Sequence, residues 1–229
     1  MKISSYENSK SGICYFPAPF VYYYKVENHK DIKEKLLPEI EEDLKINADK
    51  IKNDWCCDVT SSFHFSQSDF LFKNDLLMDQ IWKAYNGCID QLIYDELVSN
   101  DTDIRQCIMD EMWYNIYEKG GNQEIHCHKP FDFSGIYILD DTQVNNTIFW
   151  YEANMFPTGL SPYISFDHPA YEGTSVSEVG EGYIIIFPGS LPHYVPNVKD
   201  KKISLSFNFT CTSTEVGTGD DCTSENLET

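Results

Sequence analysis

The sequence is poor in basic residues. Its 17 Lys and Arg stand against 37 Asp and Glu, which leaves a formal net charge of −20 over 229 residues. A chain this acidic is repelled by phosphate backbones and by anionic lipids, so the composition disfavours non-specific binding to nucleic acids or membrane surfaces. We therefore expect no nucleic-acid partner and no membrane partner, while the composition leaves the oligomeric state open.

Long apolar runs are also missing. A transmembrane helix needs about 20 predominantly apolar residues, and the longest candidate, 13–24, is short and is interrupted by Pro17 and Pro19. The N-terminus lacks the apolar region that is typical of a secretory signal. The eight cysteines include no Cys-x-x-Cys pair, which favours reduced thiols over a disulfide framework. These features predict a cytoplasmic protein.

The chain does contain enough apolar material for a core, with 41% hydrophobic and 14% aromatic residues. Its first half has helical periodicity. Apolar residues recur at every fourth position between about 29 and 52, where Pro38 predicts a kink or a break. A second helix is expected over about 75–98, with one apolar stripe made of Leu77, Ile81, Tyr85, Cys88 and Leu92. We expect both helices to pack against a sheet.

The second half consists of short aromatic and β-branched runs separated by turn residues. Strands are expected at 109–118, 124–128, 134–139, 147–151, 183–187 and 202–211. The last of these alternates, with Ile203, Leu205, Phe207 and Phe209 on one face and Ser204, Ser206, Asn208 and Thr210 on the other. Many short strands at this spacing indicate a sandwich or a double-sheet jelly roll, and hence a mainly β protein with some α.

These patterns predict one domain over residues 1–211. It would comprise a helical support at 1–104 and a jelly-roll core at 105–211, followed by a flexible acidic tail at 212–229. The segment 152–175 is rich in Pro, Gly and Tyr, and long loops of this kind commonly cover a functional site.

The chemically informative segment is the His-x-His pair His126 and His128. Residues two apart on a strand project to the same face, so the two imidazoles can chelate a transition metal with one or two further ligands. His193 is the third candidate, because it follows a strand and a Pro-Gly turn that a jelly roll can bring to the same mouth. A lone His-x-His pair is a weak signal. The remaining histidines, His29, His64 and His168, are read as ordinary surface residues.

An ordered string of motifs strengthens this interpretation. It comprises Trp113-Tyr114-Asn115-Ile116-Tyr117, Gly120-Gly121-Asn122, His126-Cys127-His128, Ser134-Gly135-Ile136-Tyr137-Ile138-Leu139, Phe187-Pro188-Gly189-Ser190-Leu191-Pro192-His193 and Lys202-Ile203-Ser204-Leu205-Ser206-Phe207-Asn208. Over about 108–210 the chain resembles the Fe(II)- and 2-oxoglutarate-dependent dioxygenase superfamily. More narrowly, it resembles a family of 2OG-Fe(II) oxygenases found largely in marine bacteria and phages.

The resemblance implies a double-stranded β-helix that holds Fe(II) between its sheets. His126 would be the first ligand and His193 the distal one. The superfamily usually has Asp or Glu two residues after the first His, where this chain has His128. We expect His128 to be the third ligand, with Asp132 as the alternative. Three neutral imidazoles would leave the metal more positively charged than the usual set does.

The resemblance also implies a site for 2-oxoglutarate as co-substrate. In the superfamily a basic residue after the distal His binds the far carboxylate, with a hydroxyl two positions on. Lys202 and Ser204 occupy these positions, although Arg is more common than Lys. Asn115 and Tyr117 share a strand face and are further candidates for binding the co-substrate carboxylates. Trp113, Phe149 and Trp150 are expected in the core.

The expected function is therefore Fe(II)- and 2-oxoglutarate-dependent oxygenation, most often hydroxylation, of a small molecule or a protein side chain. The first hundred residues are expected to contact neither metal nor co-substrate. A second hypothesis is a catalytically silent jelly roll that serves as a binding or structural module, for example in a phage particle. A third is a cupin-like metal enzyme that does not use 2-oxoglutarate.

Overall fold

The protein is described from a computed structural model that covers residues 2–4, 11–15, 20–51, 57–64, 69–95, 107–143, 147–149, 176 and 179–211. The segment expected to form a loop over the site, 152–175, and the acidic tail, 212–229, lie outside these residues. None of the described helices is long and apolar enough to cross a membrane.

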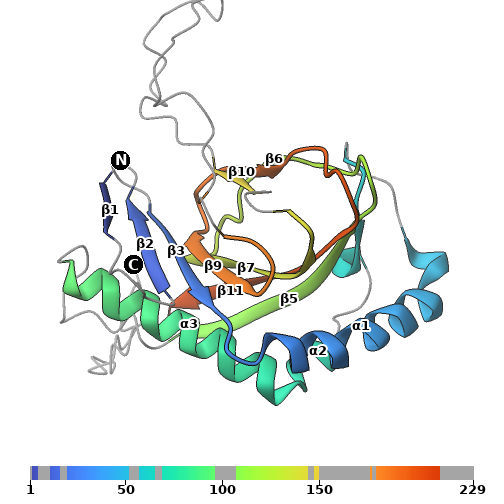
Figure 1. Cartoon of the computed structure of the whole chain (residues 1–229), viewed down its shortest axis with the longest axis horizontal. Coiled ribbons are helices and arrows are strands. Elements are labelled where there is room, and N and C mark those ends of the chain that lie inside the picture. The colour runs from blue at the N-terminus through green and yellow to red at the C-terminus, as the bar shows by residue number, and fades with distance from the viewer. Residues whose placement is uncertain are drawn as a thin grey trace, which may run out of the picture.

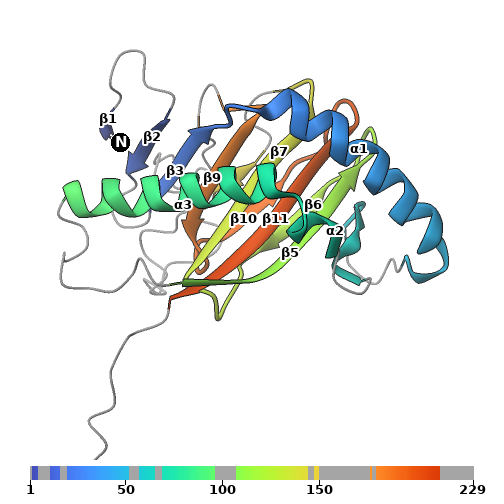
Figure 2. The ribbon, with the colours of Figure 1, turned by 90° about the horizontal axis from the view of Figure 1, so that it is seen from below.

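Two antiparallel sheets and a helical layer make up the architecture (Figures 1 and 2). The strands of the large sheet are, in spatial order, β1 (Lys2–Ser4), β2 (Ser11–Tyr15), β3 (Phe20–Lys25), β9 (Tyr183–Pro188), β7 (Phe133–Asp141), β11 (Lys202–Cys211), β5 (Cys107–Tyr117) and β4 (Thr60–Ser61). The small sheet has the order β6 (Gln123–His126), β10 (His193–Val195) and β8 (Ile148–Phe149). The helices are α1 (His29–Ile46), α2 (Asp69–Phe72) and α3 (Asp75–Tyr94), with 3-10 turns at Ala48–Lys50 and Ser62–His64.

The central strands of the large sheet, β9, β7 and β11, are buried on both faces. Figure 2 shows α1 and α3 lying across its outer face. Alternation along β11 sends Ile203, Leu205, Phe207 and Phe209 into this outer core, where they pack with the apolar stripe of α3. The opposite face of β11 points into the space between the sheets, and its Lys202, Ser204, Ser206 and Asn208 are all buried. The predicted jelly roll with helical support is therefore confirmed.

The α3 stripe predicted from the sequence is buried throughout, from Leu77 to Leu92. The side chain of Asn74 caps the helix by accepting a hydrogen bond from the backbone N–H of Leu77 (3.1 Å). Replacing one of these fully buried aliphatic side chains with Ala typically costs about 2–5 kcal/mol of unfolding free energy, so this packing is a major contribution to stability.

Three expectations about the first half of the chain need correction. Of the kink or break predicted at Pro38, the break does not occur, because the helix is continuous from His29 to Ile46. Pro38 lies on the exposed side of this helix, so the loss of its backbone N–H leaves the packing of the core undisturbed. The N-terminal region is not only helical, since β1, β2 and β3 extend the large sheet and Tyr22 pairs with Ile186 of β9. Within the apolar run at 13–24, β2 ends at Tyr15 and β3 begins at Phe20.

The third correction concerns His29, which was read as an ordinary surface residue. Its Nδ1 lies 2.7 Å from the hydroxyl of buried Tyr137, and its Nε2 lies 3.0 Å from Oε1 of Glu181. Lys33 donates to the same Glu181 oxygen (2.7 Å) and to Asp140 (2.8 Å). This cluster joins α1 to β7 and to the turn before β9, so His29 has a structural role. The side chains of His64 and His168 lie outside the described part of the chain.

Candidate metal centre

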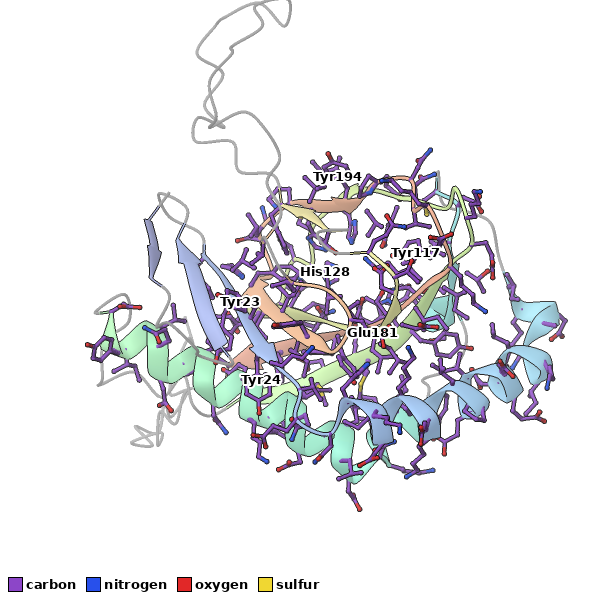
Figure 3. The ribbon with its side chains drawn as sticks, viewed as in Figure 1. Tyr23, Tyr24, Tyr117, His128, Glu181 and Tyr194 are labelled. Atoms are coloured by element: carbon purple, nitrogen blue, oxygen red, sulfur yellow. The ribbon has the colours of Figure 1, made fainter. Side chains whose placement is uncertain are left out.

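Two of the three candidate histidines lie on adjacent strands of the small sheet. His193 of β10 is in register with His126 of β6, and their ring centroids are 4.3 Å apart. Alternation along β10 buries His193 and Val195. Tyr194 between them lies on the outer side, as Figure 3 shows. His193 is 2% exposed and packs against Phe187, with centroids 4.7 Å apart.

The third histidine, His128, follows directly after β6 and lies inside the ring formed by the two sheets (Figure 3). Its backbone N–H donates to the carbonyl of Gly189 (2.7 Å), in the Pro-Gly turn before His193. At Gly189 a Cβ atom would come within 2.3 Å of the Phe131 carbonyl oxygen, so only glycine allows this approach. One ring nitrogen from each of His126, His128 and His193 lies within 4.8 Å of the others. The convergence expected from the sequence is observed.

The hydrogen bonds of the three rings determine which nitrogen faces the centre. Nδ1 of His126 lies 2.8 Å from the Glu124 carbonyl oxygen, and Nδ1 of His193 lies 3.0 Å from that of Leu191. A carbonyl oxygen only accepts, so both Nδ1 atoms donate and both Nε2 atoms keep a lone pair. Nδ1 of His128 lies 2.8 Å from Oδ1 of Asn208, which gives the same tautomer. Three Nε2 lone pairs are thus available to a metal.

The protonation state is also suited to metal binding. The pKa of His128 is lowered to about 4, mainly because of burial and to a smaller extent because of neighbouring His126, although the bond to Asn208 opposes the shift. Burial lowers the pKa of His193 well below its usual value, with added contributions from His126 and His128. Both rings are therefore neutral at pH 7, as metal ligation requires.

Asp132, the alternative third ligand, does not join this cluster. Its side chain is exposed and accepts a hydrogen bond from the backbone N–H of Cys211 (2.7 Å), at the far end of β11. Among the described residues, the group able to hold a metal consists of the three histidines alone. The geometry therefore favours His128 over Asp132.

Behind the histidines lies an inner cavity, lined by His193, Lys202, Ser204 and Thr147 among others. Lys202 is 1% exposed, and its Nζ has no hydrogen-bond partner. Oδ2 of Asp141, which is also buried, forms a long ion pair with this Nζ at 3.9 Å. Burial lowers the pKa of Lys202 to about 8, and Asp141 only partly opposes the shift. Lys202 and Ser204 therefore face the lumen, as strand alternation predicted.

Asn115 and Tyr117 also lie on the lumen side of β5, in register with Ser204 and Lys202 of β11. The Asn115 amide nitrogen donates to the Ser206 hydroxyl (3.0 Å), while its Oδ1 is buried without a partner. The Tyr117 hydroxyl donates to Oε1 of Gln123 (2.6 Å), and burial raises the pKa of Tyr117. Both residues are close to the expected co-substrate position, and their role as its ligands stays a prediction.

On the other side of the histidines an outer cleft of about 310 Å³ opens to solvent. His126 and His128 line both spaces, so a bound metal would sit between them. Trp113, expected in the core, lines the cleft and stacks on His128 with centroids 5.7 Å apart. Phe63 lines it as well, so the N-terminal support contributes to the cleft.

Phe149 is buried as expected, and Trp150 lies outside the described residues.

Comparison with known proteins agrees with this geometry. The model of one protein family, described as "Putative 2OG-Fe(II) oxygenase", matches residues 111–208, which include all three histidines, Lys202 and Ser204. The jelly-roll core matches the 2OG-Fe(II) oxygenases. The resemblance to 2OG-Fe(II) oxygenases is thereby confirmed for this segment, which is somewhat less than half of the chain, while the origin in marine bacteria and phages stays a prediction. Iron and 2-oxoglutarate are the cofactor and co-substrate that this family description names.

One solved structure shares the fold at low sequence identity, and two further structures are similar to a lesser extent. AviO1 from Streptomyces viridochromogenes Tue57 has a TM-score of 0.53 and 11% identity, covering 82% of this chain and 89% of its own. A prolyl-4-hydroxylase from Pseudomonas putida has a TM-score of 0.49 and 12% identity, covering 84% and 93%. The viral collagen prolyl hydroxylase vCPH from Paramecium Bursaria Chlorella virus-1 has a TM-score of 0.43 and 14% identity, covering 83% and 96%. No curated protein matches the sequence significantly.

Sequence reasoning missed two polar residues of the site. Asn208 holds the ring of His128, and Thr147 places a buried hydroxyl without a partner on the inner cavity. Strand alternation did assign Asn208 to the lumen face of β11. Its contact with His128 could not be inferred because it depends on how the loop after β6 folds over that strand.

Proposed function

We propose that this protein is an Fe(II)- and 2-oxoglutarate-dependent oxygenase that hydroxylates a small molecule or a protein side chain. One observation carries the proposal. Three Nε2 lone pairs converge beside a cavity in which the buried ammonium of Lys202 has no hydrogen-bond partner. The long ion pair with Asp141 (3.9 Å) compensates this buried charge only in part, and the far carboxylate of 2-oxoglutarate would be its hydrogen-bonded partner.

The histidines and the polar side chains of the inner cavity fit both Fe(II) and 2-oxoglutarate. Neutral imidazoles are suitable ligands for Fe(II). Because three of them bring no negative charge, the chelating keto-acid end of 2-oxoglutarate would supply the compensating charge. At the other end, Lys202 would form the ion pair, and the hydroxyls of Ser204 and Thr147 would donate hydrogen bonds to the same carboxylate.

The inner cavity has room for only about one water molecule between its present side chains. The co-substrate must therefore displace side chains when it enters. The hydrogen bond between Tyr117 and Gln123 crosses this region, since both residues line the cavity. We propose that co-substrate binding breaks this bond and redirects the Tyr117 hydroxyl to a carboxylate oxygen.

Together, the bound iron and 2-oxoglutarate would supply the oxidising chemistry, with the balance R–H + O2 + 2-oxoglutarate → R–OH + succinate + CO2. The protein's own residues provide the rest. The histidines hold the metal between the two spaces, Lys202 and the hydroxyls orient the co-substrate, and Trp113 shields the ring of His128 on the cleft side. The outer cleft is then the place for the substrate.

Anaerobic titration tests the proposal. Adding Fe(II) and then 2-oxoglutarate to the protein should produce the weak visible charge-transfer band of the ternary complex, and admission of O2 should yield succinate. Iron binding without a response to 2-oxoglutarate would instead favour a metal enzyme of another kind.

The alternative is a catalytically silent jelly-roll module with a binding or structural role. It is favoured by one observation, that no carboxylate joins the histidine cluster among the described residues. Failure to bind either iron or 2-oxoglutarate would support it. We also propose a cytoplasmic location, that of the host cell if a phage encodes the chain, because the cysteine spacing, which contains no Cys-x-x-Cys pair, favours reduced thiols. An origin in marine bacteria or phages belongs to the same proposal.

A further inference from the structure

The outer cleft carries negative charge beside the histidines. Glu111 and Glu124 both line it, and Lys129 is the only basic side chain among its described lining residues. The inner cavity carries positive charge instead, because Lys202 is the ionised side chain among its described lining residues. The two spaces thus differ in the charge that they would attract.

Glu111 is held in a fixed position. Its Oε2 accepts a hydrogen bond from the Asn208 amide nitrogen (3.1 Å), and Asn208 is itself 2% exposed and bonded to His128. A carboxylate offers about four lone-pair positions, and this bond uses only one of them. Among the described residues, no basic side chain forms an ion pair with Glu111. Its charge is therefore oriented next to a metal ligand and is still available to a cation.

Three aromatic side chains also line the cleft. Phe63 and Trp113 meet edge to face with centroids 5.2 Å apart, and Phe131 also lines the space. Aromatic faces attract cations through their quadrupole and pack well against aliphatic chains. The combination of a fixed carboxylate and aromatic walls suits an organic cation better than an inorganic one.

We propose that the outer cleft binds a substrate that carries an ammonium or guanidinium group on an aliphatic chain, with Glu111 as its charge partner. This inference rests on the proposed function in one respect, that it assigns the cleft to the substrate. Because Glu111 is linked to His128 through Asn208, the carbon chain next to the cation would lie beside the metal centre. The acidic cleft would also disfavour the binding of anionic 2-oxoglutarate in the substrate's place, and the net charge of −20 would attract cations to the protein.

Calorimetric titration of the metal-free protein tests this inference, because an amine cannot coordinate iron under these conditions. Pentylamine should bind roughly tenfold or more tightly than pentan-1-ol, its uncharged counterpart. Glu111→Gln keeps an acceptor for the Asn208 amide and should reduce pentylamine affinity to that of the alcohol. Glu41→Gln, the same change at an exposed position on α1, should leave pentylamine affinity unaltered. Equal binding of amine and alcohol, or equal amine binding by wild type and Glu111→Gln, would overturn the inference.

A second arm identifies the source of the cation. N-acetyl-lysine methylamide binding as tightly as pentylamine would indicate a side chain of a protein, while binding of pentylamine alone would indicate a small molecule; both agree with the inference. Titrating iron and 2-oxoglutarate separately distinguishes the two proposals. An intact ternary complex without amine selectivity contradicts the inference alone, and amine selectivity without a ternary complex contradicts the proposed function alone.

Discussion

Nδ1 of His128 lies 2.8 Å from Oδ1 of Asn208, and the same oxygen accepts a hydrogen bond from the Ser134 hydroxyl (2.7 Å). The amide of one buried asparagine on β11 thus fixes the tautomer and the orientation of a candidate metal ligand that lies on another segment. Partners of this kind commonly contribute 10–100-fold to metal affinity.

Asn208→Ala should therefore weaken Fe(II) binding by about 10–100-fold, measured by anaerobic titration. It also leaves the Ser134 hydroxyl and the His128 ring without an acceptor, which should lower the free energy of unfolding by about 1–3 kcal/mol. Thr210→Ser, on the same strand, is the control. It keeps the hydroxyl that donates to Oδ2 of Asp110 (2.6 Å) and should alter neither quantity appreciably. Unchanged iron affinity in Asn208→Ala would show that the ring is held by its packing.

The metal site itself is tested by single alanine substitutions of His126, His128 and His193. Each removes one of three ligands, so each should lower Fe(II) affinity by about 100-fold or more, measured by equilibrium dialysis without oxygen. Asp132→Asn is the matched control, because Asp132 faces β11 and should leave affinity within a factor of about three. If Asp132→Asn impairs binding and His128→Ala does not, the ligand assignment is wrong.

The affinity for 2-oxoglutarate should depend on pH through Lys202. Its pKa of about 8 lies below the usual value because burial disfavours the charged form. Binding of a carboxylate needs the protonated form, so affinity should be constant below pH 8 and fall by about tenfold per pH unit above it. Calorimetry in the presence of a redox-inert divalent metal measures this dependence.

Lys202→Ala should weaken 2-oxoglutarate binding severely and remove this pH dependence, while iron affinity stays close to that of the wild type. Lys201→Ala provides the control, because Lys201 is exposed and its nearest carboxylate, Glu118, is 3.9 Å away. An affinity that stays constant through pH 9 in the wild type would argue against Lys202 as the carboxylate partner.

Thr147→Val separates a role in binding from a role in stability. The Thr147 hydroxyl is buried without a hydrogen-bond partner, so its replacement by a methyl group of similar shape should leave unfolding free energy unchanged or raise it by about 1 kcal/mol. Loss of a hydrogen bond to the co-substrate should at the same time lower 2-oxoglutarate affinity by about tenfold. Chemical denaturation and calorimetry on the same preparation give both values. A destabilised variant with normal affinity would assign the hydroxyl to the fold.

Much of the core could be predicted because it depends on local periodicity. The bounds 202–211 of the last strand and the buried stripe of α3 follow directly from alternation and helical spacing. The same alternation placed Lys202 on the lumen side. What escaped prediction depends on contacts between distant segments. The pairing of β3 with β9 turns an apolar run into a strand, and the approach of the loop after β6 to β11 gives Asn208 its partner.

The order of strands also restricts when this protein can fold during its synthesis. β11 lies between β7 and β5 in the large sheet and pairs with both, although it is the last described strand along the chain. A nascent chain that ends before residue 202 has no strand to join β7 to β5, and it lacks both Lys202 and Asn208. The sheet is therefore completed only after the ribosome has released the C-terminal part of the domain. Until then, both central strands present free edges to which chaperones, or other copies of the chain, can bind.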